Sequence, residues 1–248
     1  MRIALFSDVH GNLTALEAVL DRIDGQEFDL LVFAGDLCFY GPRPSECIRL
    51  LRERRIVGVY GNTDEWILGQ GTAPDRFREL IAWTADRLTD ADKLWLGNLP
   101  FSLTVNPTAE PFSGVHVVHA NPRDVNQVMF LSEADHLSRY GEVHQTDGDL
   151  ANLLEGLAAG VLAYGHLHIP STRQWHDRLL VNVSSVSLPG DDDPQAKYAI
   201  LTWNDDQWTA EHVRVPYDPA PEITAFKQLM PPGWQESVAL LESYDMIP

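Results

Sequence analysis

Seven side chains of metal-binding type stand out in the sequence, because each lies just after a short apolar run. They are Asp8, His10, Asp36, Asn62, His119, His166 and His168. Carboxylate, imidazole and amide oxygen together suit borderline divalent ions such as manganese, iron or zinc. The set holds no cysteine, which argues against a structural zinc site. One histidine at a strand end is more often structural than ligating, but seven residues in equivalent places predict a metal centre.

The elements that must position these side chains alternate between strands and helices. Strands are predicted at residues 2–7, 28–34, 56–60, 115–119 and 161–164. Helices are predicted at residues 13–23, 45–54, 74–96, 131–140 and 146–157, with Ser45 as an N-cap. Because the strands end on polar residues, the pattern is typical of an α/β sheet whose site lies at the carboxyl ends of its strands.

The last third of the chain has a different pattern. Four short runs, at residues 171–176, 179–183, 198–204 and 208–215, are separated by turn residues and predict an antiparallel meander. The βα part and this meander are expected to form two sheets packed face to face. Beyond Pro216 the chain is rich in proline and includes an amphipathic stretch at residues 234–241. We expect one domain, residues 1–248, in which residues 216–248 form a C-terminal helical appendage that caps this subunit or packs on another.

The charge balance limits the partners. The chain has 36 acidic and 18 basic residues, which gives a formal net charge of −18. Such a surface repels polyanions and disfavours a long nucleic acid or an anionic membrane, whereas a local site can still bind a small phosphorylated substrate. Cys38 and Cys47 are too few for a disulfide framework, and we find no leader and no apolar stretch of about 18 residues. We expect a cytoplasmic protein, and a homo-oligomer is compatible with the sequence.

Five sequence blocks carry a resemblance to a known family. Asp8-x-His10, Gly35-Asp36, Gly61-Asn62-x-Asp64, His119 and Gly165-His166-x-His168 resemble, in order and spacing, the signature blocks of the calcineurin-like metallophosphoesterase superfamily. The stretches at residues 35–42, 119–124 and 180–186 are similar to its small bacterial phosphoesterase branch. The resemblance covers residues 1 to about 200. It implies an α/β fold, a four-layer α/β/β/α sandwich of two mixed sheets.

The resemblance also implies a ligand set for two divalent metal ions. Asp8, His10 and His168 would bind the first ion, Asn62, His119 and His166 the second, and Asp36 would bridge both. His116 competes with His119 for its place, and we prefer His119 because it closes the strand and precedes Ala-Asn-Pro. Manganese is the expected metal, with iron, zinc, nickel and cobalt as alternatives.

A two-metal site of this kind has a defined chemistry. Two ions about 3.5–4 Å apart share a water, lower its pKa from 15.7 towards about 7 and clamp a phosphoryl oxygen. A hydroxide bridging the ions would attack phosphorus in line with the leaving oxygen, and the metals would neutralise charge on the equatorial oxygens. We therefore expect a phosphoric ester hydrolase.

Three residues near the blocks refine this expectation. Thr63 stands where many family members have a histidine acid, and threonine cannot protonate a leaving alkoxide near pH 7. Because branch members without this histidine are associated with phosphodiesters, we expect small diesters as substrates. Asp64 is a candidate for orienting Asn62 or a helix N-cap, and Arg123 is a candidate for binding the substrate phosphate or a surface ion pair.

Two other functions remain open. A phosphomonoesterase acting on nucleotides or phosphoproteins would use the same metals. A non-catalytic protein-binding module on the same fold is the alternative from another class, although such modules tend to have lost metal ligands and all seven are present here.

Overall fold

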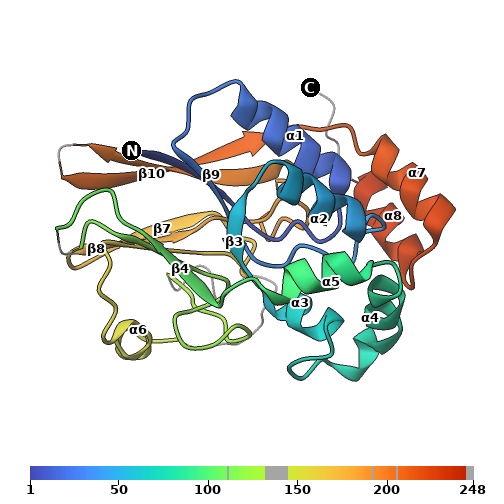
Figure 1. Cartoon of the computed structure of the whole chain (residues 1–248), viewed down its shortest axis with the longest axis horizontal. Coiled ribbons are helices and arrows are strands. Elements are labelled where there is room, and N and C mark those ends of the chain that lie inside the picture. The colour runs from blue at the N-terminus through green and yellow to red at the C-terminus, as the bar shows by residue number, and fades with distance from the viewer. Residues whose placement is uncertain (111, 132–144, 192, 205, 244–248) are drawn as a thin grey trace.

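The structure is a computed structural model that describes residues 1–110, 112–131, 145–191, 193–204 and 206–243. Among these residues the strands form two five-stranded sheets (Figure 1). The first has the order β10 (Gln207–Val215), β9 (Ala196–Asn204), β1 (Arg2–Phe6), β2 (Leu30–Ala34), β3 (Val57–Val59). The second has the order β4 (Ser102–Val105), β5 (Val115–Val118), β6 (Val161–Tyr164), β8 (Arg178–Asn182), β7 (Ser171–Trp175). Each sheet mixes parallel and antiparallel pairs, which confirms the predicted fold class.

Helices pack on the outer face of each sheet, so that the molecule has four layers. Helices α1 (Leu13–Asp24) and α2 (Pro44–Glu53) cover the first sheet, and α6 (Asp147–Leu154) covers the second. Along β1 the side chains alternate: Phe6 belongs to the core under α1 and α2, whereas Leu5 belongs to the core between the sheets. This sandwich brings the carboxyl ends of the parallel strands of both sheets to one edge.

The segment between β3 and β4 is helical beyond the predicted residues 74–96, and it is divided into short pieces. They are α3 (Asn62–Ile67), a 3₁₀ helix (Asp75–Phe77), α4 (Arg78–Ala85) and α5 (Asp90–Gly97).

The prediction of Ser45 as an N-cap was wrong, because α2 begins one residue earlier at Pro44. Proline is preorganised for the first helical position and has no N–H to be capped. The Ser45 hydroxyl instead donates to Asp92, 2.5 Å away.

The four strands predicted as one antiparallel meander are divided between the two sheets. β7 and β8 form a hairpin in the second sheet, and β9 and β10 form a hairpin in the first. β8 pairs in parallel with β6, and β9 pairs antiparallel with β1. Each hairpin thus occupies the free edge of a parallel strand, and local strand signals do not say which edge is free. The helix predicted at residues 131–140 lies outside the described residues.

The C-terminal appendage folds back onto the same chain at one end of the molecule (Figure 1). Helices α7 (Ala220–Leu229) and α8 (Trp234–Ser243) pack together through Phe226, Val238 and Leu241. Glu222 of α7 is fully buried and pairs with the Arg43 guanidinium. No helix within the described ranges is long and apolar enough to cross a bilayer.

Candidate metal centre

The candidate ligands lie on the turns that follow the parallel strands. Asp8 and His10 follow β1, Asp36 follows β2, and His166 and His168 follow β6. All five have positive φ angles, between 50° and 65°. Aspartate and histidine are enriched among non-glycine residues in this region, and such strain clusters at functional sites. The turns therefore aim these side chains at one point instead of continuing the strands.

Two glycines allow these turns to approach one another. A Cβ at Gly61 would lie 2.1 Å from Asp36 Oδ1, and a Cβ at Gly165 would lie 2.0 Å from Ser7 Oγ and 2.5 Å from Asp8 Oδ2. Any side chain at these positions would separate the turns, so the cluster depends on the absence of a Cβ.

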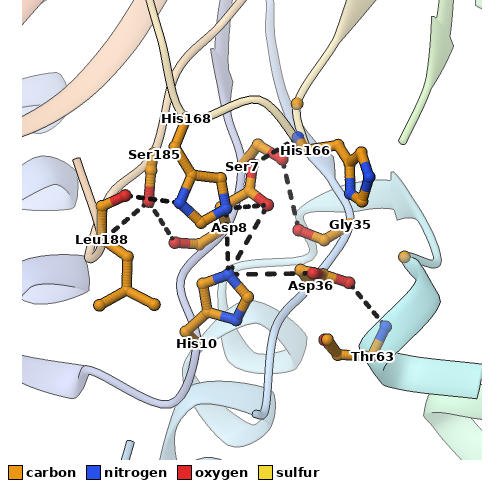
Figure 2. A network of polar contacts seen from close by, with 12 residues as sticks. Ser7, Asp8, His10, Gly35, Asp36, Thr63, His166, His168, Ser185 and Leu188 are labelled. Atoms are coloured by element: carbon orange, nitrogen blue, oxygen red, sulfur yellow. Dashed lines mark hydrogen bonds and ion pairs between the residues drawn. The ribbon is translucent and has the colours of Figure 1, made fainter. Parts of the chain in front are cut away.

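One group of ligand atoms lies around His10 (Figure 2). His168 Nε2 is 3.1 Å from Asp8 Oδ1 and 3.3 Å from His10 Nε2. His10 Nε2 also lies 3.7 Å from Asp8 Oδ1 and 3.8 Å from Asp36 Oδ2. The structure thus brings together Asp8, His10 and His168, with one oxygen of Asp36 beside them.

A second group lies around His119. His119 Nε2 is 3.1 Å from Asn62 Oδ1, 3.2 Å from His166 Nδ1 and 3.4 Å from Asp36 Oδ1. The two oxygens of Asp36 therefore face different groups, the arrangement a bridging carboxylate requires. His116 lies outside both groups, and its Nδ1 is 2.8 Å from Thr104 Oγ1.

The backbone determines which ring nitrogen faces the centre. Three histidines direct their outer nitrogens at carbonyl oxygens: His119 at Ala34, His166 at Asn126 and His168 at Leu188. Because a carbonyl only accepts, the outer nitrogen must carry the proton, and in a neutral ring the inner nitrogen presents a lone pair. The lone pairs of His119 and His168 face carboxylate or amide oxygens at 3.1–3.4 Å, and that of His166 faces His119 Nε2 at 3.2 Å. A ring lone pair and an oxygen at this distance are held together by a cation between them, either a proton or a metal ion, so the donor set fits divalent ions.

The pKa values of the candidate ligands also indicate a site that binds cations. Burial by itself lowers the pKa of His119, yet the Asp36 and Asp8 carboxylates raise it to about 9. Burial lowers the pKa values of His10 and His166 to about 4, so both rings are neutral at pH 7. For Asp36 burial opposes ionisation, but the neighbouring histidines hold its pKa well below the usual range. The centre is thus a buried anionic site that attracts either protons or metal ions.

Asp64 connects the two loops that carry Asp36 and Asn62. Its buried carboxylate accepts hydrogen bonds from the backbone N–H groups of Asp36 at 2.9 Å, Leu37 at 3.0 Å and Gly61 at 2.9 Å. Burial and the Asp36 charge raise its pKa to about 7. The sequence left Asp64 between orienting Asn62 and capping a helix. The N-cap of α3 is Gly61, whose N–H donates to Asp64 at the third helical position, and an orienting role towards Asn62 stays a prediction.

Arg123 and Thr63, the other residues singled out in the sequence, have different surroundings. The Arg123 guanidinium donates to the carbonyls of Asn152 and Glu155, the contact of a structural residue, and its phosphate-binding role stays a prediction. Thr63 is buried, and its Oγ1 has no hydrogen-bond partner among the described residues. The Ser185 hydroxyl donates to the Asp8 carbonyl, a contact that sequence reasoning missed because its acceptor is backbone.

Comparisons with known proteins agree with this geometry. Residues 1–206 match the calcineurin-like phosphoesterase superfamily domain. An uncharacterized protein of Methanocaldococcus jannaschii is 30% identical over 227 residues, 87% of this chain and 88% of the relative. The crystal structure of a metallophosphoesterase from Sphaerobacter thermophilus is 27% identical with a TM-score of 0.74, and the match covers 97% of this chain and 98% of that one.

A further likeness concerns the fold alone. A hypothetical protein from Pyrococcus horikoshii is 17% identical, with a TM-score of 0.79 and 97% of each chain covered. The resemblance predicted from the five sequence blocks is confirmed, because the superfamily match spans 206 of the 248 residues. The chain belongs to the calcineurin-like phosphoesterase superfamily.

Proposed function

We propose that this protein is a phosphoester hydrolase that uses two divalent ions and prefers small phosphodiesters. The observation that carries the proposal is the division of Asp36 between two ligand groups, Oδ2 towards His10 and Oδ1 towards His119. One set would comprise Asp8, His10 and His168, and the other Asn62, His119 and His166. Manganese is the first ion to test, because mixed carboxylate and imidazole donors suit it.

The chain's own groups have defined tasks in this reaction. When bound, divalent ions lower the pKa of water and neutralise charge on phosphoryl oxygens. The backbone carbonyls of Ala34 and Leu188 hold the His119 and His168 rings in position, so no reorientation is needed during the reaction. The Thr63 N–H donates to Asp36 Oδ1 at 3.0 Å and restrains the shared carboxylate.

The acidity of the side chains beside the centre bears on the preference for diesters. Thr63 Oγ1 is buried without a hydrogen-bond partner among the described residues, and its hydroxyl is too weak an acid to supply a proton near pH 7. Tyr40 also keeps its proton, because burial and the Asp36 charge raise its pKa to about 12. Because position 63 carries threonine in place of an imidazole acid, we expect the reaction to favour esters whose leaving group is stable as an anion.

The experiment compares hydrolysis of bis-p-nitrophenyl phosphate and p-nitrophenyl phosphate by metal-free and manganese-loaded protein. We expect activity only with manganese and a higher kcat/KM for the diester. A strong monoester preference would replace the diester proposal with the phosphomonoesterase, and metal-independent or absent hydrolysis of both would reject the enzyme proposal.

His116 in β5 and His119 just after it provide a matched control. His119→Gln removes a proposed ligand, so it should abolish activity and lower the manganese stoichiometry. His116→Gln alters the competing histidine, three residues earlier, and should leave both unchanged. The opposite result would assign the ligand to His116. Cytoplasmic location, homo-oligomerisation and the single-domain assignment stay predictions.

A further inference from the structure

A cavity of about 400 Å³ lies between the helices after β3 and the C-terminal appendage. One wall comes from Arg76, Phe77 and Glu79, of the 3₁₀ helix and α4, and the opposite wall from Glu236 and Ser237 of α8. Figure 1 shows α4 and α8 at the same end of the molecule. Pockets of about 300–1,000 Å³ are the usual size for small-molecule sites.

Tyr40 connects this cavity to the candidate metal centre. It lines the cavity, and its ring packs edge-on against the His10 ring with 5.5 Å between centroids. The turn that carries it is held to the metal loop, because Gly41 N–H donates to the His10 carbonyl at 2.6 Å. Tyr40 itself has a φ of 79°, a strained conformation for a bulky residue. Tyr40 thus contacts a proposed metal ligand and also lines the cavity.

The lining of the cavity favours a flat, uncharged group. Tyr40 and Phe77 contact one another edge-on at 5.7 Å, and the Arg76 guanidinium lies 4.7 Å above the Phe77 ring. Trp66 also stacks with Phe77 at 5.9 Å, so a ligand ring would meet the Arg76 guanidinium plane and the aromatic edges, which bind another ring by stacking or edge-to-face contact. The carboxylates of Glu79 and Glu236 disfavour a second anionic group, and they can accept hydrogen bonds from a ring substituent.

We propose that this cavity is the subsite for a neutral aromatic ring carried by the organic group of the substrate, so that the substrates are nucleoside or aryl phosphoesters. The proposal rests on the proposed hydrolase function, since Tyr40 adjoins the metal centre through His10. It also assigns a role to α8, which lies beyond the residues that match the superfamily domain. The appendage forms one wall of the substrate site.

The test measures binding of phenylphosphonate and methylphosphonate to the manganese-loaded protein by isothermal titration calorimetry. Both ligands present the same phosphonate group to the metal centre and differ only in the ring. We expect phenylphosphonate to bind about tenfold more tightly, the size of a favourable aromatic contact. Calorimetry does not depend on turnover, so the ring preference is measured independently of hydrolysis.

Two tryptophan substitutions on α8 form a matched pair. Ser237→Trp places a ring in the cavity and should reduce the phenyl advantage to less than twofold, without weakening methylphosphonate binding. Ala239→Trp, an exposed position on the same helix that does not line the cavity, should keep the full advantage. If circular dichroism shows that Ser237→Trp does not fold, Phe77→Leu replaces it and should lower the same ratio.

The outcomes separate this inference from the function on which it rests. Equal binding of the two phosphonates by the wild type, or an undiminished phenyl advantage in the folded Ser237→Trp or Phe77→Leu protein, would overturn the subsite while leaving the hydrolase intact. Failure of both phosphonates to bind, together with absent diester hydrolysis, would reject the hydrolase and the subsite with it.

Discussion

Replacing Asp36 by asparagine tests the central feature of the proposed site. Asp36 is 2% exposed, and its two oxygens face the two ligand groups separately. Asp36→Asn keeps the size of the side chain but removes the negative charge and turns one oxygen into an N–H donor. Whichever way the amide is oriented, only one group keeps an oxygen ligand and the other faces an N–H donor, so the shared ligand is lost.

The expected magnitude follows from the contacts of the carboxylate. Loss of a group that only orients a metal ligand typically costs 10–100-fold in metal affinity, so loss of a shared ligand should cost more than about 100-fold at one site at least. In the metal-free protein the Asp36 carboxylate is the main group that raises the pKa of His119 to about 9 against the effect of burial. The substitution should therefore lower this pKa by at least about 1 pH unit, or about 1.4 kcal/mol of lost interaction.

Two measurements check these expectations. Calorimetric titration with manganese should show two bound ions in the wild type and at most one in Asp36→Asn. NMR titration of the imidazole resonances, with the chelated protein, should show the lower pKa of His119. Two ions bound with wild-type affinity by Asp36→Asn would refute the shared-ligand geometry, and an unchanged His119 pKa would refute the electrostatic argument.

Three further perturbations test the metal chemistry, the appendage and the close approach of the loops. Manganese affinity should rise about tenfold per pH unit from pH 7 towards 9 in calorimetric titrations, because a proton on His119, whose pKa is about 9 without metal, must leave before the nitrogen can bind. Glu222→Ala should lower the free energy of unfolding in urea by about 3–5 kcal/mol, because it leaves Arg43 without its buried partner. Gly61→Ala should weaken manganese binding by about tenfold or more, as measured by calorimetry, because its Cβ would lie 2.1 Å from Asp36 Oδ1.

Each of these has a control within the chain. A manganese affinity that is flat with pH would contradict the protonation argument. Asp21→Asn, on the exposed face of α1, should change stability by no more than about 0.5 kcal/mol in the urea experiment. Gly25→Ala, with negative φ and no neighbour nearer than 3.8 Å, should leave metal binding unchanged. A Glu222→Ala protein as stable as Asp21→Asn would show that the ion pair contributes little.

Local patterns predicted most strands and helices of the first sheet. Apolar runs that end on polar residues identified β1, β2 and β3, and helical spacing identified α1, because both periodicities are properties of neighbouring residues. The pairing of β9 with β1 and of β8 with β6 escaped this reasoning. Sheet pairing depends on which edges remain free after folding, and no local signal encodes that.

The candidate site was likewise predicted from the sequence only in part. Residue types and spacing alone singled out seven side chains from five strand ends, because ligand chemistry is carried by side chains. Only the tertiary structure decided that the oxygens of Asp36 face two groups and that the carbonyls of Ala34 and Leu188 orient His119 and His168. Every residue has a carbonyl, so sequence cannot say which one a histidine meets. Likewise, the cavity beside Tyr40 exists only because the fold brings α8 opposite α4, so that segments about 150 residues apart line the same cavity.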